Sequence, residues 1–100
     1  MEKRKPTYDL ESFKAEFSAV ARLRMTRTAR NCAFALGLGL QGVVDVIQRM
    51  TRQQFYKSMT SYGDVKVWQD VYHVPHGDTV LYLKLTVDAE GKLLIAFKEK

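Results

Sequence analysis

Three lysines lie inside strand-like runs in the second half of the chain. Lys57, Lys84 and Lys98 each stand among apolar and aromatic residues, and Tyr82 and Gln69 lie in runs of the same kind. Lysine is depleted in β-strands, so one interpretation is a cationic, aromatic sheet face that holds an oxyanion or a phosphate. The alternative is a solvated face whose long charged side chains discourage pairing at the sheet edge.

Lysine, tyrosine, glutamine and histidine around an open sheet face suit metal-free cleavage of RNA. The ribose 2′-OH attacks the adjacent phosphorus, so the substrate supplies the nucleophile. The protein must align this group, accept its proton, stabilise charge on the phosphate and protonate the leaving 5′-oxygen. Lysines can supply the positive charge, tyrosine or glutamine can position the 2′-OH or a base edge, and exposed aromatic rings can stack bases.

Other site chemistry has less support. His73 and His76 have Asp70 and Asp78 nearby, but a strand followed by a Pro/Gly turn fixes such ligands poorly, and a structural zinc site needs more Cys or His. We therefore expect no metal and no cofactor. Cys32 lies on the apolar stripe of a predicted helix, where a buried and inert cysteine is the usual case.

Composition predicts one small domain over residues 1–100 with a single core. The one cysteine cannot form an internal disulfide, which fits a reducing compartment. No apolar run approaches the roughly 20 residues of a transmembrane helix, and no signal-peptide core follows the basic start. We expect a cytoplasmic protein without membrane association.

The net charge of +5 comes entirely from the first 54 residues, which hold all seven arginines. A basic domain favours a polyanionic partner, although anionic membranes and acidic proteins also qualify. Because the second half is formally neutral, phosphate contacts away from a cut site are assigned to Arg22, Arg24, Arg27 and Arg30. The alternative is that these arginines form a solvated surface.

Hydrophobic periodicity predicts an α+β fold, with N-terminal helices packed on a C-terminal antiparallel sheet. Residues 1–6 are interpreted as a frayed basic tail, and 51–54 match a capping box. In the third strand Leu81, Leu83 and Leu85 should pack on the helices, which leaves Tyr82 and Lys84 open to a ligand. The predicted helices cover 8–21, 28–36 and 41–50, and the predicted strands cover 23–25, 55–60, 66–74, 79–87 and 92–98.

Several runs of residues, collinear from the first residue to the last, resemble the MqsR family of motility quorum-sensing regulator toxins. The helical region from about 7 to 50 resembles the family more loosely. The matching runs are Met1-Glu-Lys-Arg4, Phe55-Tyr-Lys-Ser-Met-Thr60, Trp68-Gln-Asp-Val-Tyr72, Tyr82-Leu-Lys84 with Thr86-Val87, and Phe97-Lys-Glu-Lys100.

The resemblance implies a RelE-like α+β fold and a ribosome-independent mRNA endoribonuclease, the toxin of a type II toxin–antitoxin module, that prefers GC-containing triplets. It also implies a cognate antitoxin that binds zinc and DNA. The family's catalytic residues fall on Lys57, Gln69 and Tyr82. The residues expected to bind substrate are Met59, Lys84, Lys98, Arg22, Arg24 and His73.

The roles within this site are open between alternatives. Lys57 neutralises the scissile phosphate or acts as the acid. Tyr82 transfers a proton or orients the 2′-OH, while Gln69 holds ribose or base. One stretch departs from the family, in which arginines follow the Trp-Gln-Asp-Val-Tyr run, because this chain has His73 and His76 there. Histidine is a better proton shuttle than arginine but a weaker phosphate clamp above neutral pH.

Two rival functions are considered. One is a non-catalytic module that binds nucleic acid or a protein partner on the same scaffold, with Lys57 and Tyr82 as binding residues. The other is a DNA-binding regulator with a helix-turn-helix formed by residues 28–36 and 41–50. The second of these helices carries few side chains that could read bases, which disfavours the regulator.

Overall fold

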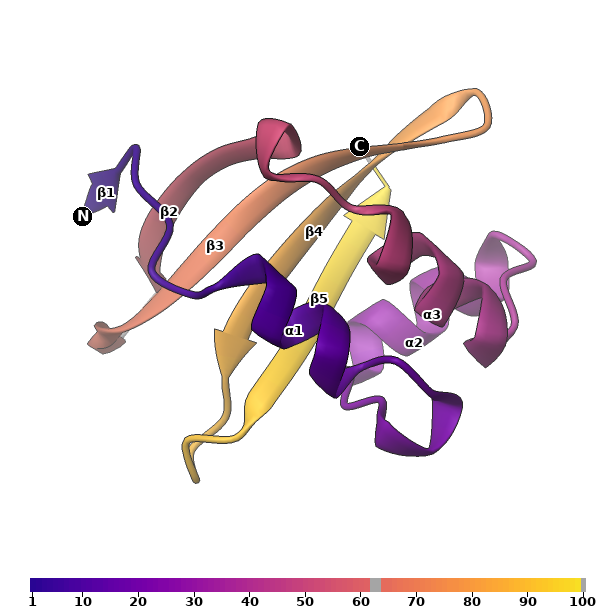
Figure 1. Cartoon of the computed structure of the whole chain (residues 1–100), viewed down its shortest axis with the longest axis horizontal. Helices are drawn as coiled ribbons and strands as arrows, with labels where there is room; N and C mark the ends of the chain where they lie inside the picture. The colour runs from indigo at the N-terminus through magenta and orange to yellow at the C-terminus, as the bar shows by residue number, and fades with distance from the viewer. Residues whose placement is uncertain (62–63, 100) are drawn as a thin grey trace.

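The computed structural model describes residues 1–61 and 64–99, which form three α-helices on one five-stranded antiparallel sheet (Figure 1). The α+β prediction is thereby confirmed. The strands lie in the order β1-β2-β3-β4-β5. The elements are β1 (Glu2–Lys3), α1 (Leu10–Glu16), α2 (Arg27–Ala35), α3 (Leu40–Arg49), β2 (Phe55–Ser61), β3 (Asp64–His76), β4 (Thr79–Val87) and β5 (Leu93–Glu99), with 3₁₀ turns at Val20–Arg22 and Arg52–Gln54.

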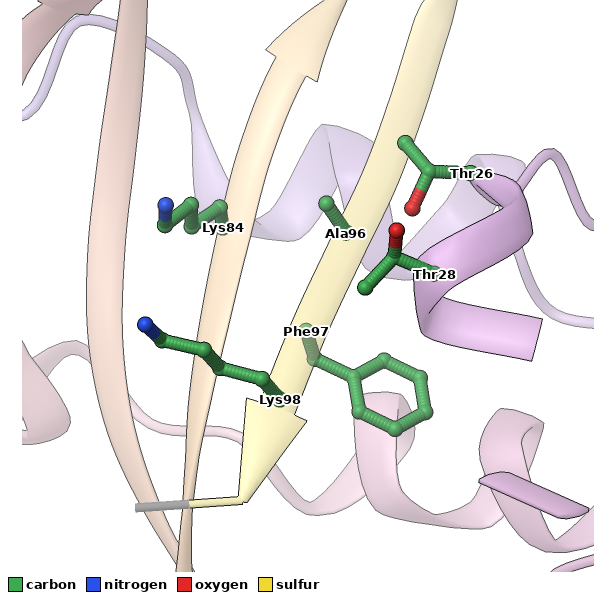
Figure 2. A pocket seen from close by; sticks show the side chains of 6 residues that line it. All are labelled: Thr26, Thr28, Lys84, Ala96, Phe97 and Lys98. Carbon is green, nitrogen blue, oxygen red and sulfur yellow. The ribbon is translucent and has the colours of Figure 1, made fainter. Parts of the chain in front are cut away.

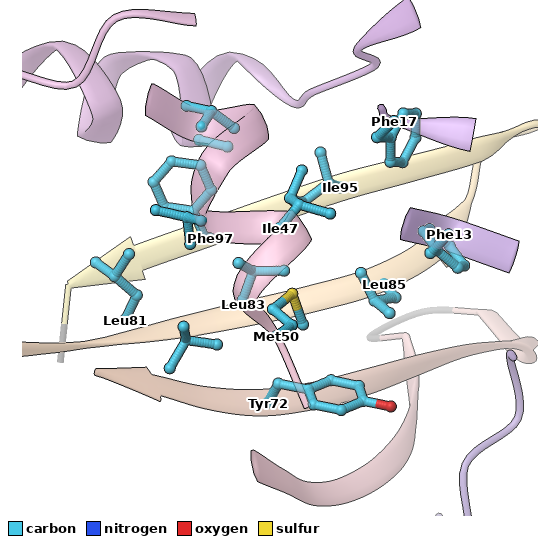
Figure 3. Packing of buried hydrophobic residues seen from close by; sticks show 14 of the residues in the cluster. Phe13, Phe17, Ile47, Met50, Tyr72, Leu81, Leu83, Leu85, Ile95 and Phe97 are labelled. Atoms are coloured by element: carbon cyan, nitrogen blue, oxygen red, sulfur yellow. The ribbon is translucent and has the colours of Figure 1, made fainter. Parts of the chain in front are cut away.

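The helices cover one face of the sheet. Leu81, Leu83 and Leu85 of β4 are buried beneath them, as the alternation predicts, together with Tyr72 of β3 and Ile95 of β5. Figure 3 shows Ile47 and Met50 packed over these strands beside Phe13 and Phe17. Because successive side chains of a strand point to opposite faces, the intervening residues are left on an open face.

The first helix is shorter than predicted. It ends at Glu16, and Val20 lies in a separate 3₁₀ turn rather than on the helical stripe. Gln48 of α3 donates hydrogen bonds to the carbonyl oxygens of Lys14 and Phe17, at 2.7 and 3.3 Å. A partner distant in sequence therefore satisfies carbonyl groups at the end of this helix, where the helix itself offers no partner.

The remaining predicted boundaries differ from the structure by a few residues. The predicted capping box at Thr51 and Gln54 is present. The strand predicted over 23–25 is reduced to one parallel bridge between Met25 and Ile95. Strand β3 continues through Pro75, where its only neighbour is β4, so that a residue without an N–H is tolerated. The turn predicted at Gly63 lies outside the described residues.

The N-terminal segment is ordered rather than frayed, which corrects the prediction for residues 1–6. Strand β1 pairs with β2, and the backbone N–H of Thr60 donates to the Met1 carbonyl oxygen at 3.0 Å. The buried Asp70 carboxylate then accepts hydrogen bonds from the backbone N–H groups of Thr7 and Tyr8, at 2.8–3.0 Å. Buried backbone and carboxylate groups are thereby satisfied together.

No single helix within residues 1–61 and 64–99 has the length and apolarity needed to cross a membrane. The pair α2 and α3 passes that test of length and composition only when joined, and the two helices are bent by 99° at their break.

Candidate active site on the open sheet face

Strand register arranges the open-face side chains in rows that cross the sheet. Residues opposite one another on neighbouring strands share a face, with the strands about 4.8 Å apart. The two rows at the centre of the face therefore alternate charged, aromatic and small residues. They are Lys57, Val71, Lys84 and Ala96 in one row and His73, Tyr82 and Lys98 in the next.

A bulge in β2 adds an aromatic ring to the second row. The register with β3 shifts between Phe55 and Lys57, so Tyr56 is the extra residue. Bulges change the direction of side chains. Here Tyr56 and Lys57, although adjacent in the chain, both line the same pocket on the open face.

Three rings form a continuous stack along the second row. Tyr56 lies against His73 with ring centroids 4.3 Å apart, and His73 lies against Tyr82 at 4.6 Å, with interplanar angles of 27° and 17°. The outer ring belongs to Tyr56, whose residue is 44% exposed. An exposed aromatic face of this kind can accept a nucleobase by stacking.

A pocket of about 320 Å³ collects these residues, and we call it the central pocket. It contains five of the residues that the sequence assigns to the site, from three different strands. Its lining consists of Tyr56, Lys57, Met59, Val71, His73, Tyr82, Lys84 and Lys98.

The lysines of the central pocket differ in their electrostatics. Lys84 is partly buried, and burial together with repulsion from Lys98 and Lys57 lowers its pKa below the usual value. Lys57 forms an ion pair with Glu2, and the hydrogen bond to that carboxylate raises the pKa of Lys57. Cations that repel one another around a pocket favour an anionic occupant, because an anion relieves the repulsion.

A second pocket of about 250 Å³ adjoins the central pocket, and we call it the edge pocket. Lys84 and Lys98 line both pockets and extend from neighbouring strands to the same side, while Thr26 and Thr28 lie across β5 at the start of α2 (Figure 2). The small side chain of Ala96 lies between the two groups. The edge pocket lengthens the cationic surface across the sheet.

Other residues assigned to the site lie outside both pockets. Gln69 is opposite Met59 in the register, so it lies at the margin of the central pocket. Arg22 forms an ion pair with Glu16 at 2.8 Å. Arg24 is 3.9 Å from Asp88. Their predicted contacts with RNA stay predictions.

The two histidines do not act as a pair. Three residues apart in β3, His73 and His76 point to opposite faces of the sheet. Asp70, considered as a possible ligand beside them, is buried and accepts hydrogen bonds from the N-terminal backbone. The described residues contain no cluster of three or more His, Cys, Asp or Glu side chains suited to a metal ion.

The structure adds Glu2, Tyr56 and Val71 to the sequence-based site. Tyr56 enters through the bulge, which leaves no mark in the composition of β2. Glu2 enters through a two-residue strand, too short to show any alternation. The one sequence signal for Glu2 is the family resemblance, whose matching runs begin at Met1.

Comparison with known proteins gives two matches. Residues 5–99 match the family model described as "Motility quorum-sensing regulator, toxin of MqsA". The chain is also 42% identical, over all 100 residues of both proteins, to the "mRNA interferase toxin MqsR" of Escherichia coli (strain K12).

Proposed function

Because this chain belongs to the MqsR toxin family, we propose that it is an mRNA endoribonuclease that needs neither metal nor ribosome. It cuts single-stranded RNA at GC-containing triplets by attack of the ribose 2′-OH on the adjacent phosphorus. The observation that carries the proposal is the central pocket, in which Lys57, Lys84 and Lys98 surround the phenol of Tyr82. These are the groups needed to bind a phosphate and move a proton.

The scissile phosphate lies over Val71, between Lys57 and Lys84. Their backbones stand about 10 Å apart, two strand spacings, a distance that two lysine side chains and one phosphate can fill. A base next to that phosphate stacks on the exposed ring of Tyr56. The strand then continues over β5 towards Thr28 in the edge pocket.

The family description supplies the partner. It names a toxin of an antitoxin, so we infer that this chain also has a cognate antitoxin, one that binds zinc and DNA. An mRNA substrate places the activity in the cytoplasm.

The test is cleavage of a defined RNA in EDTA without ribosomes, by the wild type and by Lys57→Ala. We expect products with a 2′,3′-cyclic phosphate and a 5′-hydroxyl, and a rate about 10²–10³-fold lower in the variant, because one charge-stabilising donor is lost. Lys92→Ala is the matched control, since Lys92 is exposed in the turn before β5 and pairs with Glu90.

Each outcome decides between the two functions. Wild-type protein that binds RNA without cutting it would support the non-catalytic module instead. Substrates that differ only in their GC-containing triplets test the sequence preference, and equal cutting of both would remove that part of the proposal.

A further inference from the structure

Strand β1 brings a carboxylate to the open face. Glu2 is opposite Met59 in the register, and Met59 lines the central pocket. Residues directly opposite on paired strands share a face, and diagonal neighbours lie within reach of long side chains. Glu2 accordingly pairs with Lys57, and among the described residues it is the only carboxylate that forms an ion pair with a residue of this pocket.

The cleavage reaction needs a group that accepts the proton of the 2′-OH. Lys57 is unsuited because its ion pair with Glu2 raises its pKa and keeps it an ammonium ion. The pKa of Lys84 is lowered by burial and by neighbouring lysines, but a phosphate bound beside Lys84 favours its charged form again. Glu2 is an ionised carboxylate, since the hydrogen bond and charge of Lys57 lower its pKa.

The order of groups across the face suits an in-line displacement. Lys57 lies one row from Glu2 on one side and one row from Tyr82 on the other. The backbones of β1 and β4 are separated by three strand spacings, about 14 Å. Glutamate and tyrosine side chains extending over the sheet with one phosphate between them can fill that span. The carboxylate and the phenol then stand on opposite sides of the phosphorus.

We propose that Glu2 is the general base of the reaction and that Tyr82 is the acid opposite it, a proposal that rests on the RNA-cleaving function. The bond from the 2′-oxygen to phosphorus forms while the bond from phosphorus to the 5′-oxygen breaks. The 2′-OH proton passes to the Glu2 carboxylate, and the 5′-oxygen receives the phenolic proton of Tyr82. Lys57 leaves its ion pair to hold the phosphate. The carboxyl and phenolate groups then exchange protons with water and return to their starting state.

The first test is Glu2→Gln, which keeps the size of the side chain and removes the base. We expect kcat to fall about 10²–10⁴-fold, and the acidic limb of the pH–rate profile to disappear. Affinity for an RNA with a 2′-deoxy nucleotide at the cut site, which cannot react, should be unchanged or tighter because a negative charge is removed. Glu11→Gln is the matched control, since Glu11 is exposed and lies 3.9 Å from Lys14.

A substrate with sulfur in place of the bridging 5′-oxygen separates base from acid. A thiolate leaves without protonation, so this RNA should restore cleavage by Tyr82→Phe and leave Glu2→Gln defective. Rescue of Glu2→Gln by the sulfur substrate would overturn the proposal, because Glu2 would then act on the leaving group.

Two further results would contradict the role of Glu2. If Glu2→Gln weakens RNA binding and lowers kcat without changing the shape of the pH profile, the residue only positions Lys57. If Glu2→Asp and Glu2→Gln lose stability and activity to the same degree, the residue only holds β1 in place. A wild type that cuts while Glu2→Gln cuts equally well removes this proposal alone, whereas a folded wild type that cuts no RNA removes the proposed function.

Discussion

The two faces of the sheet use alternate residues of the same strands in different ways. On the helix-covered face, Asp70 is buried and its carboxylate accepts hydrogen bonds from the backbone of Thr7 and Tyr8. On the open face, Lys84 and Lys98 line both pockets, and neither takes part in a salt bridge within the described residues. Satisfied polar groups stabilise a fold, while charges without ion-pair partners favour a ligand.

This contrast teaches that substitutions one residue apart should affect different properties. Changes on the helix-covered face should lower the free energy of unfolding, and changes on the open face should lower the rate or the affinity for RNA. A variant that affects both properties equally would break the comparison.

The largest effect is expected on the helix-covered face, from Asp70→Ala. The variant leaves two backbone N–H groups without their charged acceptor, and each such hydrogen bond contributes about 1.5–3 kcal/mol. We expect the free energy of unfolding to fall by about 3–5 kcal/mol, measured by urea denaturation. Asp45→Ala on exposed α3 is the control, and a loss below about 1 kcal/mol in Asp70→Ala would contradict the anchoring role.

Tyr82→Phe should give the opposite result on the open face. Loss of the phenolic hydroxyl removes a proton donor, so kcat should fall about 10²-fold. The ring and its stack on His73 are retained, so the free energy of unfolding should change by less than about 0.5 kcal/mol. Single-turnover cleavage and thermal denaturation measure the two quantities, and unchanged cleavage would exclude Tyr82 from the chemistry.

The two faces also differ in how far the sequence predicts them. Alternation in residues 79–87 correctly separates Leu83 from Tyr82, because a period of two follows directly from strand geometry. The bulge at Tyr56 could not be predicted, since a register shift depends on the partner strand. The same holds for the end of α1, which depends on Gln48 in another helix. The helix-covered face was therefore predicted more completely than the open one.

A smaller effect is expected from Lys98→Met. Lys98 is exposed, and exposed charge pairs contribute up to about 1 kcal/mol, so RNA affinity should fall about 3–10-fold. The pKa of Lys84 should rise, because repulsion from Lys98 is one of the causes that lower it. An NMR titration of the Lys84 ammonium group measures this shift, and an unchanged pKa would show that the two lysines do not interact.

The lowered pKa of Lys84 also gives a sign for the pH dependence of stability. Between that pKa and the ordinary lysine value near 10.5, the unfolded chain binds more protons than the folded one. The contribution of Lys84 to the free energy of unfolding therefore increases as pH rises through this window. Lys84→Met should remove the increase, which pH-dependent denaturation of both proteins can measure.

The smallest effect is expected from the paired arginines beyond both pockets. Arg22 and Arg24 already lie beside Glu16 and Asp88, so contact with RNA requires these weak surface pairs to open, and the net gain in affinity is small. Salt dependence is the more sensitive measurement, because each phosphate contact adds about 0.7 to the slope of log affinity against log salt. If both arginines contact RNA, Arg22→Ala/Arg24→Ala should lower that slope by about 1.4, while Arg49→Ala on exposed α3 leaves it unchanged. An equal slope in the double variant and the wild type would restrict RNA contacts to the open face, which would make the contrast between the two faces sharper.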